Sequence, residues 1–317
     1  MLGADVGGTK VVAGLVGPGD VVLHRQRLEI PARGTPTEVT SVVADCLKAV
    51  RRSAHESPTA VGVGLAAQVD PRTGFVFHAP NLRWRDFSFG PALADLIGLP
   101  VVVVNDVQSI ALAEWRFGAG RGCSDLLCLC IGTGAGGGIV MGGELARGAT
   151  YSAGEVGHTT LFAQGRPCHC PNRGCFEAYI GGWAIEERLR EAVAADPVET
   201  RRLVDSSGGV DALTPLALER AARQGDPFAV RFVHRLAEEF ACGVVGLVNA
   251  LNPERVVVTG RIVEGFPEYV EAARRAVPER CQPSAAGAKV LLGALGVDAG
   301  ILGGALFARD LLRSSSQ

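Results

Sequence analysis

The pattern of apolar and polar residues predicts a glycine-rich β-meander at the start of the chain. Apolar residues dominate positions 2–16 apart from a Gly-Gly-Thr turn at 7–9, and a Gly-Pro-Gly-Asp turn at 17–20 leads into a third run. Short apolar runs joined by glycine turns are typical of antiparallel strands. In residues 36–54, valine, cysteine and leucine instead recur at helical spacing, which predicts a helix after the meander.

The same meander recurs in residues 125–149. An apolar run, a Gly-Thr-Gly turn, a second run, a Gly-Gly turn and a third run again follow one another. Because such repetition indicates duplicated units, it predicts an α/β protein with two similar domains, whose mixed sheets flank a central cleft. We expect a smaller domain of residues 1–115 plus 298–317, and a larger domain of residues 116–297.

The second half of the chain is predicted to be mainly helical. Helices are expected near 181–195 and 212–224, and a longer one begins at an aspartate–proline pair at 226–227. Aspartate can cap free N–H groups, and proline fits the first turn because its missing N–H would have no partner there. A buried strand is expected at 255–260 and a final helix at 300–313.

Composition and charge exclude several classes of function. Of 317 residues, 47% are hydrophobic and the net charge is −2, so the chain is globular and offers no basic surface for nucleic acid. No apolar run reaches the length of a membrane span, and the first residues do not resemble a signal peptide. Nine cysteines, an odd number, favour a reducing compartment, which predicts a cytoplasmic protein with small-molecule partners.

A cluster of cysteines is the most specific chemical signal. Cys168, Cys170 and Cys175 lie within eight residues, ten positions after His158. Three thiolates and an imidazole form a closed tetrahedral set for Zn²⁺, which predicts a structural metal site. His169 is an alternative fourth ligand or a solvent-facing side chain, and a disulfide is the alternative for the cysteines.

Two carboxylates flank this cluster. Glu155 lies three residues before His158, and Glu177 lies two residues after Cys175. An imidazole has two nitrogens, so one can bind zinc while the other faces a ligand. A zinc site would therefore bring a histidine and two carboxylates around one pocket, where they could recognise adjacent hydroxyl groups of a sugar.

Two glycine turns and one aspartate suggest phosphate chemistry. The turns DVGGTK at 5–10 and GTGAGGG at 132–138 let backbone N–H groups approach an anion, although both could be simple hairpin turns. Asp5 suits a metal-bound water that bridges to phosphate. Asp106 follows the four-valine run 101–104, where it could accept a proton from a substrate hydroxyl or cap the next helix.

Over its whole length the chain resembles the ROK family of sugar kinases and repressors, within the actin-like (ribonuclease H-like) ATPase superfamily. The resemblance rests on DVGGTK (5–10), VD…PNLRW (69–84), ND (105–106), GTGAGGG (132–138), GEVGH (154–158) and CHCPNRGCFE (168–177). It implies a catalytic base at Asp106 and a zinc site at His158, Cys168, Cys170 and Cys175. It implies sugar contacts by Asn81, Asn105, Asp106, Glu155, His158 and Glu177. It implies that ATP and Mg²⁺ are held near Asp5, Gly7, Gly8, Thr9, Lys10, Gly132, Thr133, Gly134, Gly136 and Gly260.

The resemblance implies an ATP-dependent transferase of carbohydrate metabolism that phosphorylates the 6-hydroxyl of a hexose, with glucose, the substrate of glycolysis, expected first. Alternatives are an N-acetylmannosamine or N-acetylglucosamine kinase, a polyphosphate-dependent glucokinase, and a sugar-binding regulator without catalysis. The resemblance also implies a homodimer. The chain departs from the family pattern at Leu65–Gln68, Val107, Pro171 and Thr259–Arg261. We expect Ala67 and Gln68 to crowd a substituent on carbon 2 of the sugar, which favours glucose.

Overall fold

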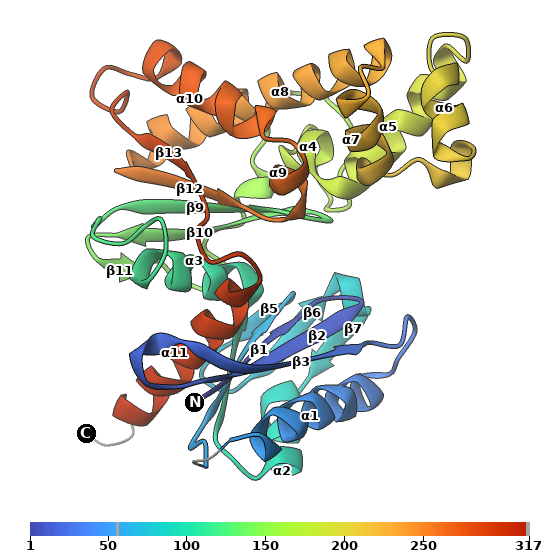
Figure 1. Ribbon diagram of the computed structural model, residues 1–317. Helices are drawn as coiled ribbons and strands as arrows, with labels where there is room; N and C mark the ends of the chain where they lie inside the picture. The colour runs from blue at the N-terminus through green and yellow to red at the C-terminus, as the bar shows by residue number, and fades with distance from the viewer. Residues whose placement is uncertain (55–56, 315–317) are drawn as a thin grey trace. The chain divides into compact units, whose positions relative to one another are not determined.

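The computed structural model describes residues 1–54 and 57–314, and their contacts divide the chain into two compact units (Figure 1). The first unit comprises Met1–Gly122, Gly138–Gly154 and Ala294–Gln317, and the second comprises Cys123–Gly137 and Glu155–Gly293. This division assigns residues 138–154 to the first unit, whereas the sequence placed them in the larger domain. The predicted domain boundaries stay a prediction.

The first sheet has the strand order β3-β2-β1-β4-β8. Its strands are β1 (Leu2–Val6), β2 (Lys10–Val16), β3 (Val22–Glu29), β4 (Val61–Leu65) and β8 (Val101–Asn105). The first three strands pair antiparallel, which confirms the predicted meander, and β4 and β8 continue the sheet in parallel from β1. A separate small antiparallel sheet consists of β5 (Gln68–Asp70), β6 (Phe75–Ala79) and β7 (Trp84–Phe87).

The second sheet repeats the order of the first, β11-β10-β9-β12-β13. Its strands are β9 (Leu126–Ile131), β10 (Ala135–Met141), β11 (Glu144–Leu145), β12 (Arg255–Thr259) and β13 (Lys289–Leu292). Here too a meander is followed by two parallel strands, β12 and β13. The duplication inferred from the glycine turns is therefore confirmed, and with it the mixed character of both sheets.

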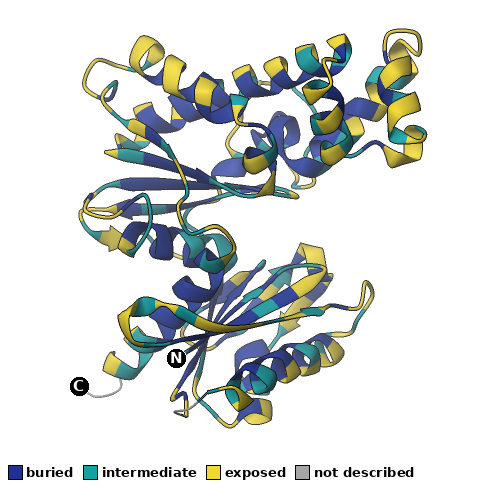
Figure 2. Cartoon of the chain, viewed as in Figure 1, coloured by how far each residue is buried: buried dark blue, intermediate teal, exposed yellow. Residues whose placement is uncertain are grey.

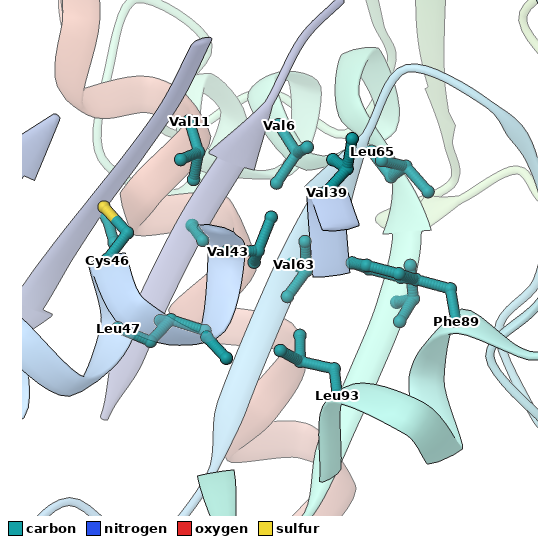
Figure 3. Close-up of a cluster of buried hydrophobic side chains, with 14 of the residues drawn as sticks. Val6, Val11, Val39, Val43, Cys46, Leu47, Val63, Leu65, Phe89 and Leu93 are labelled. Carbon is teal, nitrogen blue, oxygen red and sulfur yellow. The ribbon is translucent and has the colours of Figure 1, made fainter. Parts of the chain in front are cut away.

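Helices cover both faces of the first sheet. They are α1 (Pro36–Arg52), α2 (Phe89–Ile97), α3 (Asp106–Arg116) and α11 (Ala299–Ser314). One apolar cluster joins α1 and α2 to the sheet, with Val43 and Phe89 packed against Val6 and Val63 (Figure 3). A second cluster joins α3 and α11, including Ala113 and Ile301. Because side chains alternate along a strand, β1 directs Leu2, Ala4 and Val6 to the first cluster, while Gly3 and Asp5 face α11.

Glycines in two central strands allow α11 to approach the sheet closely. A Cβ added at Gly62 of β4 would overlap the carbonyl oxygen of Gly304, and one added at Gly3 of β1 would overlap that of Ile301. Any larger residue at these two strand positions would push backbone against backbone. Gly62 and Gly3 therefore determine how near the C-terminal helix lies to the first sheet.

Helices make up most of the second unit, as predicted. They are α4 (Glu177–Ile180), α5 (Gly182–Ala195), α6 (Arg201–Ser207), α7 (Pro215–Arg223), α8 (Pro227–Leu251), α9 (Arg261–Gly265) and α10 (Glu268–Arg280). The long helix α8 begins as predicted, because Asp226 Oδ1 accepts a hydrogen bond of 2.8 Å from the Ala229 N–H. Figure 2 shows the inner faces of these helices buried and the outer faces exposed. Within the described residues, none of the helices combines the length and apolarity needed to cross a bilayer.

Candidate functional site

The carboxyl ends of three parallel strands meet at one edge of the first sheet. Val6 of β1 pairs with Leu65 of β4, which pairs with Asn105 of β8. Asp5 therefore lies near the same edge as Asn105 and Asp106, although 100 residues separate them in the chain. This edge is where open α/β sheets bind their ligands.

Asn105 is the N-cap of α3. Its Oδ1 accepts hydrogen bonds from the N–H groups of Val107 (3.0 Å) and Gln108 (3.1 Å), and its Nδ2 donates to the carbonyl oxygen of Ala67 (3.3 Å). Asp106 is the first residue of the helix, and its Oδ1 also accepts from the Val107 N–H at 2.9 Å. The alternative in which Asp106 serves as the cap is wrong, because the preceding residue already fills that position.

The loop that follows β4 differs from expectation. The Ala67 side chain is buried in the apolar cluster of the first unit, whereas Gln68 is exposed. Ala67 cannot crowd a ligand with its methyl group, so this part of the expectation is wrong. Ala67 contributes instead through its carbonyl oxygen, which orients Asn105.

The first glycine turn connects β1 to β2 and packs on a second predicted site residue. The Gly7 N–H donates to the Lys10 carbonyl oxygen at 3.0 Å, which closes the turn. A Cβ added at Gly8 would lie 3.0 Å from Cβ of Asn81, which is in the short 3₁₀ helix Pro80–Leu82. Thr9 and Lys10 are exposed. The absence of a side chain at Gly8 therefore brings Asn81 against the turn.

Asp5 is partly buried beside the start of α11. A Cβ added at Gly300 would lie 2.7 Å from Cβ of Asp5, so the helix can approach only with glycine at this position. Burial raises the pKa of Asp5 from 3.8 to about 6, and the charge of Lys10 opposes this shift. A carboxylate with such a pKa gains from a nearby cation, which is the environment expected of a group that holds a metal-bound water.

The second glycine turn connects β9 to β10 and is held by a segment far along the chain. The Gly132 N–H donates to the Gly134 carbonyl oxygen at 2.9 Å, and Glu177 Oε2 accepts from the Ala135 N–H at 2.7 Å. A Cβ at Gly134 would overlap this carboxylate. Gly136 follows in β10, and Thr133 is exposed at the tip. Glycine at 134 is thus required by the approach of Glu177.

Gly260 lies where β12 ends, and its backbone has φ of +104°, a conformation that favours glycine. A Cβ there would overlap the carbonyl oxygen of Ile131, the last residue before the second glycine turn. The segment Thr259–Arg261, which contains the predicted nucleotide-binding residue Gly260, therefore adjoins the second glycine turn.

The four predicted metal ligands converge. His158, Cys168, Cys170 and Cys175 offer ligand atoms that all lie within 4.8 Å of one another. The Cys170 and Cys175 sulfur atoms are 3.5 Å apart, and Cys168 Sγ lies 3.6 Å from His158 Nδ1. Tetrahedral zinc, with bonds of about 2.3 Å to sulfur and about 2.0 Å to nitrogen, places neighbouring ligands about 3.5–3.8 Å apart. The donor set and its spacing therefore fit zinc.

The surroundings of the cluster also suit a cation. Asn172 directs its backbone N–H at Cys170 Sγ and its side-chain Nδ2 at Cys175 Sγ, each at 3.4 Å, which is how outer donors stabilise metal-bound thiolates. Burial raises the pKa of the Cys168 thiol to about 12, a shift that a bound divalent cation reverses. All nine cysteines are among the described residues, and none forms a disulfide.

The two histidines of the region have different roles. His158 directs Nδ1 at the cysteines, and its Nε2 lies 3.8 Å from Glu155 Oε2, so one imidazole faces both the metal cluster and a carboxylate. His169 is not one of the converging ligands, and its exposed side chain agrees with the solvent-facing alternative. Its ring stacks on Trp183 with centroids 3.9 Å apart.

Two contributors to the site, Trp183 and Gly300, were not predicted from the sequence. Trp183 Nε1 donates to Glu177 Oε1 at 3.1 Å, so both oxygens of that carboxylate have protein partners. The Gly-Gly pair directly before Trp183 was the available signal, because small residues at a helix start allow close backbone approach. Gly300 had no such signal, since only the packing of α11 reveals its contact with Asp5.

Comparison with known proteins places this arrangement in context. The family model described as the ROK family matches residues 1–311. The chain is 32% identical over 315 residues to the glucokinase of Streptomyces coelicolor, which covers 98% of this chain and 97% of that protein. It is 34% identical over 221 residues to the xylose repressor of Caldicellulosiruptor bescii, 69% of this chain and 54% of that protein.

A solved structure is similar along the whole chain. The ROK family glucokinase from Streptomyces griseus, in complex with glucose and AMPPNP, superposes with a TM-score of 0.85 at 32% identity, covering 98% of this chain and 99% of that one. This similarity confirms the predicted fold class, an actin-like α/β protein with mixed sheets.

Proposed function

Because this chain belongs to the ROK family, we propose that it is an ATP-dependent hexose kinase that phosphorylates the 6-hydroxyl of glucose. Full-length similarity to a glucokinase, and to a glucokinase structure bound to glucose and AMPPNP, supports the proposal. Phosphoryl transfer requires positioning and charge stabilisation more than covalent chemistry. The residues described above supply both functions.

Asp106 is the observation that carries the proposal. It stands in the first turn of α3 at the carboxyl edge of the first sheet, and Asn105 provides the helix cap. In the proposed reaction Asp106 accepts the proton of the sugar hydroxyl as that oxygen attacks the γ-phosphorus of ATP. A sugar-binding regulator has no use for such a base, so Asp106 favours a kinase over a non-catalytic regulator.

The glycine turns and Asp5 are proposed to serve the nucleotide. Backbone N–H groups of the two turns would bind phosphate oxygens, and Thr9 and Lys10, both exposed, would add donors. Magnesium, when bound with ATP, would supply positive charge that neutralises the phosphates. The partly buried Asp5 would orient a water molecule of that ion, which also offsets the cost of its ionisation.

The metal cluster is proposed to orient sugar-binding groups. Zinc would fix the His158 ring through Nδ1, which leaves Nε2 and the nearby Glu155 for hydroxyl groups of the hexose. Asn81 and Asn105 would add amide contacts, and Glu177 would accept a further hydroxyl through its remaining lone pairs. We also propose a homodimer in a reducing compartment such as the cytoplasm, in keeping with zinc-binding thiolates.

Replacing Asp106 with asparagine tests the central role. Asp106→Asn keeps the size of the side chain and leaves the Asn105 cap intact, so glucose affinity and the melting temperature should stay near those of the wild type. Turnover should fall by about 10²–10⁴-fold, because the amide cannot accept the proton. Asp95→Asn, an exposed aspartate on α2, is the matched control and should keep full activity. Normal turnover by Asp106→Asn would refute the catalytic role.

A further inference from the structure

The segment that leaves the cysteine cluster also holds the second glycine turn. Glu177 lies two residues after Cys175 and accepts the Ala135 N–H at 2.7 Å. The first backbone N–H groups of α5, those of Gly182 and Trp183, donate to the carbonyl oxygens of Gly132 (2.9 Å) and Thr133 (3.0 Å). Three hydrogen bonds from one short segment therefore fix the conformation of the turn.

Trp183 joins this segment back to the cysteine loop. Its Nε1 donates to Glu177 Oε1 at 3.1 Å, and its ring stacks on His169 at 3.9 Å with an angle of 20° between the planes. His169 lies between Cys168 and Cys170 in the chain. Trp183 thus contacts the loop between two proposed metal ligands, the carboxylate that holds the turn, and, through its backbone, the turn itself.

We propose that Trp183 is a positioning residue that couples the metal cluster to the nucleotide. The proposal rests on the proposed function, in which the turn at 132–135 binds ATP phosphates. The loop that carries His169 would be ordered when the cysteines and His158 hold a metal ion. The stacked indole of Trp183 donates to Oε1 of Glu177, and Oε2 of the same carboxylate accepts the Ala135 N–H. Because coupling between two sites is reciprocal, a bound nucleotide must in turn retain the metal more firmly.

Zinc release in the absence of sugar measures this coupling directly. Zinc-loaded protein is mixed with an excess of a colorimetric zinc chelator, with or without saturating AMPPNP, and the release rate is recorded. In the wild type, AMPPNP should slow release by about fivefold or more, within the usual range of coupling between sites. This readout does not depend on turnover.

Trp183→Phe separates positioning from packing. Phenylalanine can still stack on His169 but has no N–H for Glu177, so the variant should keep one zinc per chain and a melting temperature near that of the wild type. Its AMPPNP dissociation constant should rise by about three- to tenfold, less than for a direct contact, because the lost hydrogen bond positions Glu177 and does not itself touch the nucleotide. The effect of AMPPNP on zinc release should largely disappear.

Asn172→Ala is the matched control, because it perturbs the cluster away from the turn. Asn172 Nδ2 contacts Cys175 Sγ at 3.4 Å and Thr160 Oγ1 at 3.0 Å. Its loss should speed zinc release equally with and without AMPPNP, so the ratio of the two rates should match that of the wild type.

The outcomes distinguish this proposal from the function on which it rests. A Trp183→Phe variant that retains the wild-type ratio of release rates would overturn the coupling through this residue. Binding of AMPPNP to the wild type without any change in zinc release would overturn the coupling and leave the kinase assignment standing. Failure of the wild type to bind AMPPNP would overturn the proposed function and the coupling with it.

Discussion

The ionised side chain of Asp5 is expected to lower the free energy of unfolding of the protein. Its side chain packs beside Gly300 at the start of α11, and burial raises its pKa from 3.8 to about 6. At about 1.36 kcal/mol for each pKa unit, ionising Asp5 in the folded protein costs about 3 kcal/mol. The amide dipoles at the start of α11 favour the carboxylate by up to about 1 kcal/mol, which leaves a net cost of about 2–3 kcal/mol.

The direction in which the stability contribution of Asp5 changes with pH follows from proton binding. Between about pH 4 and pH 6 the folded state holds a proton on Asp5 that the unfolded chain has released, so the contribution of Asp5 to stability falls as the pH rises through this range. Asparagine is nearly isosteric and stays neutral. Asp5→Asn should therefore be more stable than the wild type by about 2–3 kcal/mol at pH 8, and by less than about 1 kcal/mol at pH 4.

Urea unfolding followed by circular dichroism at several pH values measures this difference. Each variant is compared with the wild type at the same pH, so changes elsewhere in the protein, including loss of metal in acid, cancel to first order. Asp70 is the control, because hydrogen bonds from Arg72 lower its pKa, and Asp70→Asn should lose stability at pH 8 instead. A gain for Asp5→Asn that does not depend on pH would refute the reasoning.

The same Asp5→Asn variant should lose most of its kinase activity, since an amide is a poor partner for a magnesium-bound water. A gain in stability together with a loss of activity is the usual pattern at a functional site. Full activity of the variant would show that Asp5 has no part in nucleotide binding.

Three further outcomes are expected. Purified protein should contain about one zinc per chain by metal analysis. The Cys170→Ser variant should lose the metal, part of its stability and part of its sugar affinity, because the loop that carries Glu177 loosens. Active protein without zinc would contradict this prediction. Gly62→Ala should lower the free energy of unfolding in urea by about 3 kcal/mol or more, because the added methyl group meets the backbone of α11. A smaller decrease would show that the helix can shift. In a coupled assay with ATP or polyphosphate, glucose should have a higher kcat/KM than N-acetylglucosamine or N-acetylmannosamine. Because the Ala67 side chain is buried, the expected discrimination rests on Gln68 alone. Faster turnover of either N-acetyl sugar would overturn the choice of glucose.

Local physical chemistry in the sequence determined the elements and the metal cluster. The start of α8 was predictable, because the capping of Asp226 and the fit of Pro227 depend only on their immediate neighbours. The repeated meander was predictable from its glycine turns, and both sheets contain it. The cysteines lie close together in the chain, so their spacing alone brought them within reach of one metal ion.

Only the tertiary structure shows which of two neighbouring residues fills a position such as a helix cap. It also decides which residues far apart in the chain come into contact. Asn105 rather than Asp106 caps α3, because β8 continues to Asn105 and delivers its amide to the helix start. The Ala67 side chain points into the core because of the backbone conformation of the loop after β4, which no local sequence pattern predicts. The link from His169 through Trp183 and Glu177 to Ala135 depends on the fold, since it brings together residues up to 48 positions apart. Sequence spacing carries no information about such contacts, because they form only when separate elements pack.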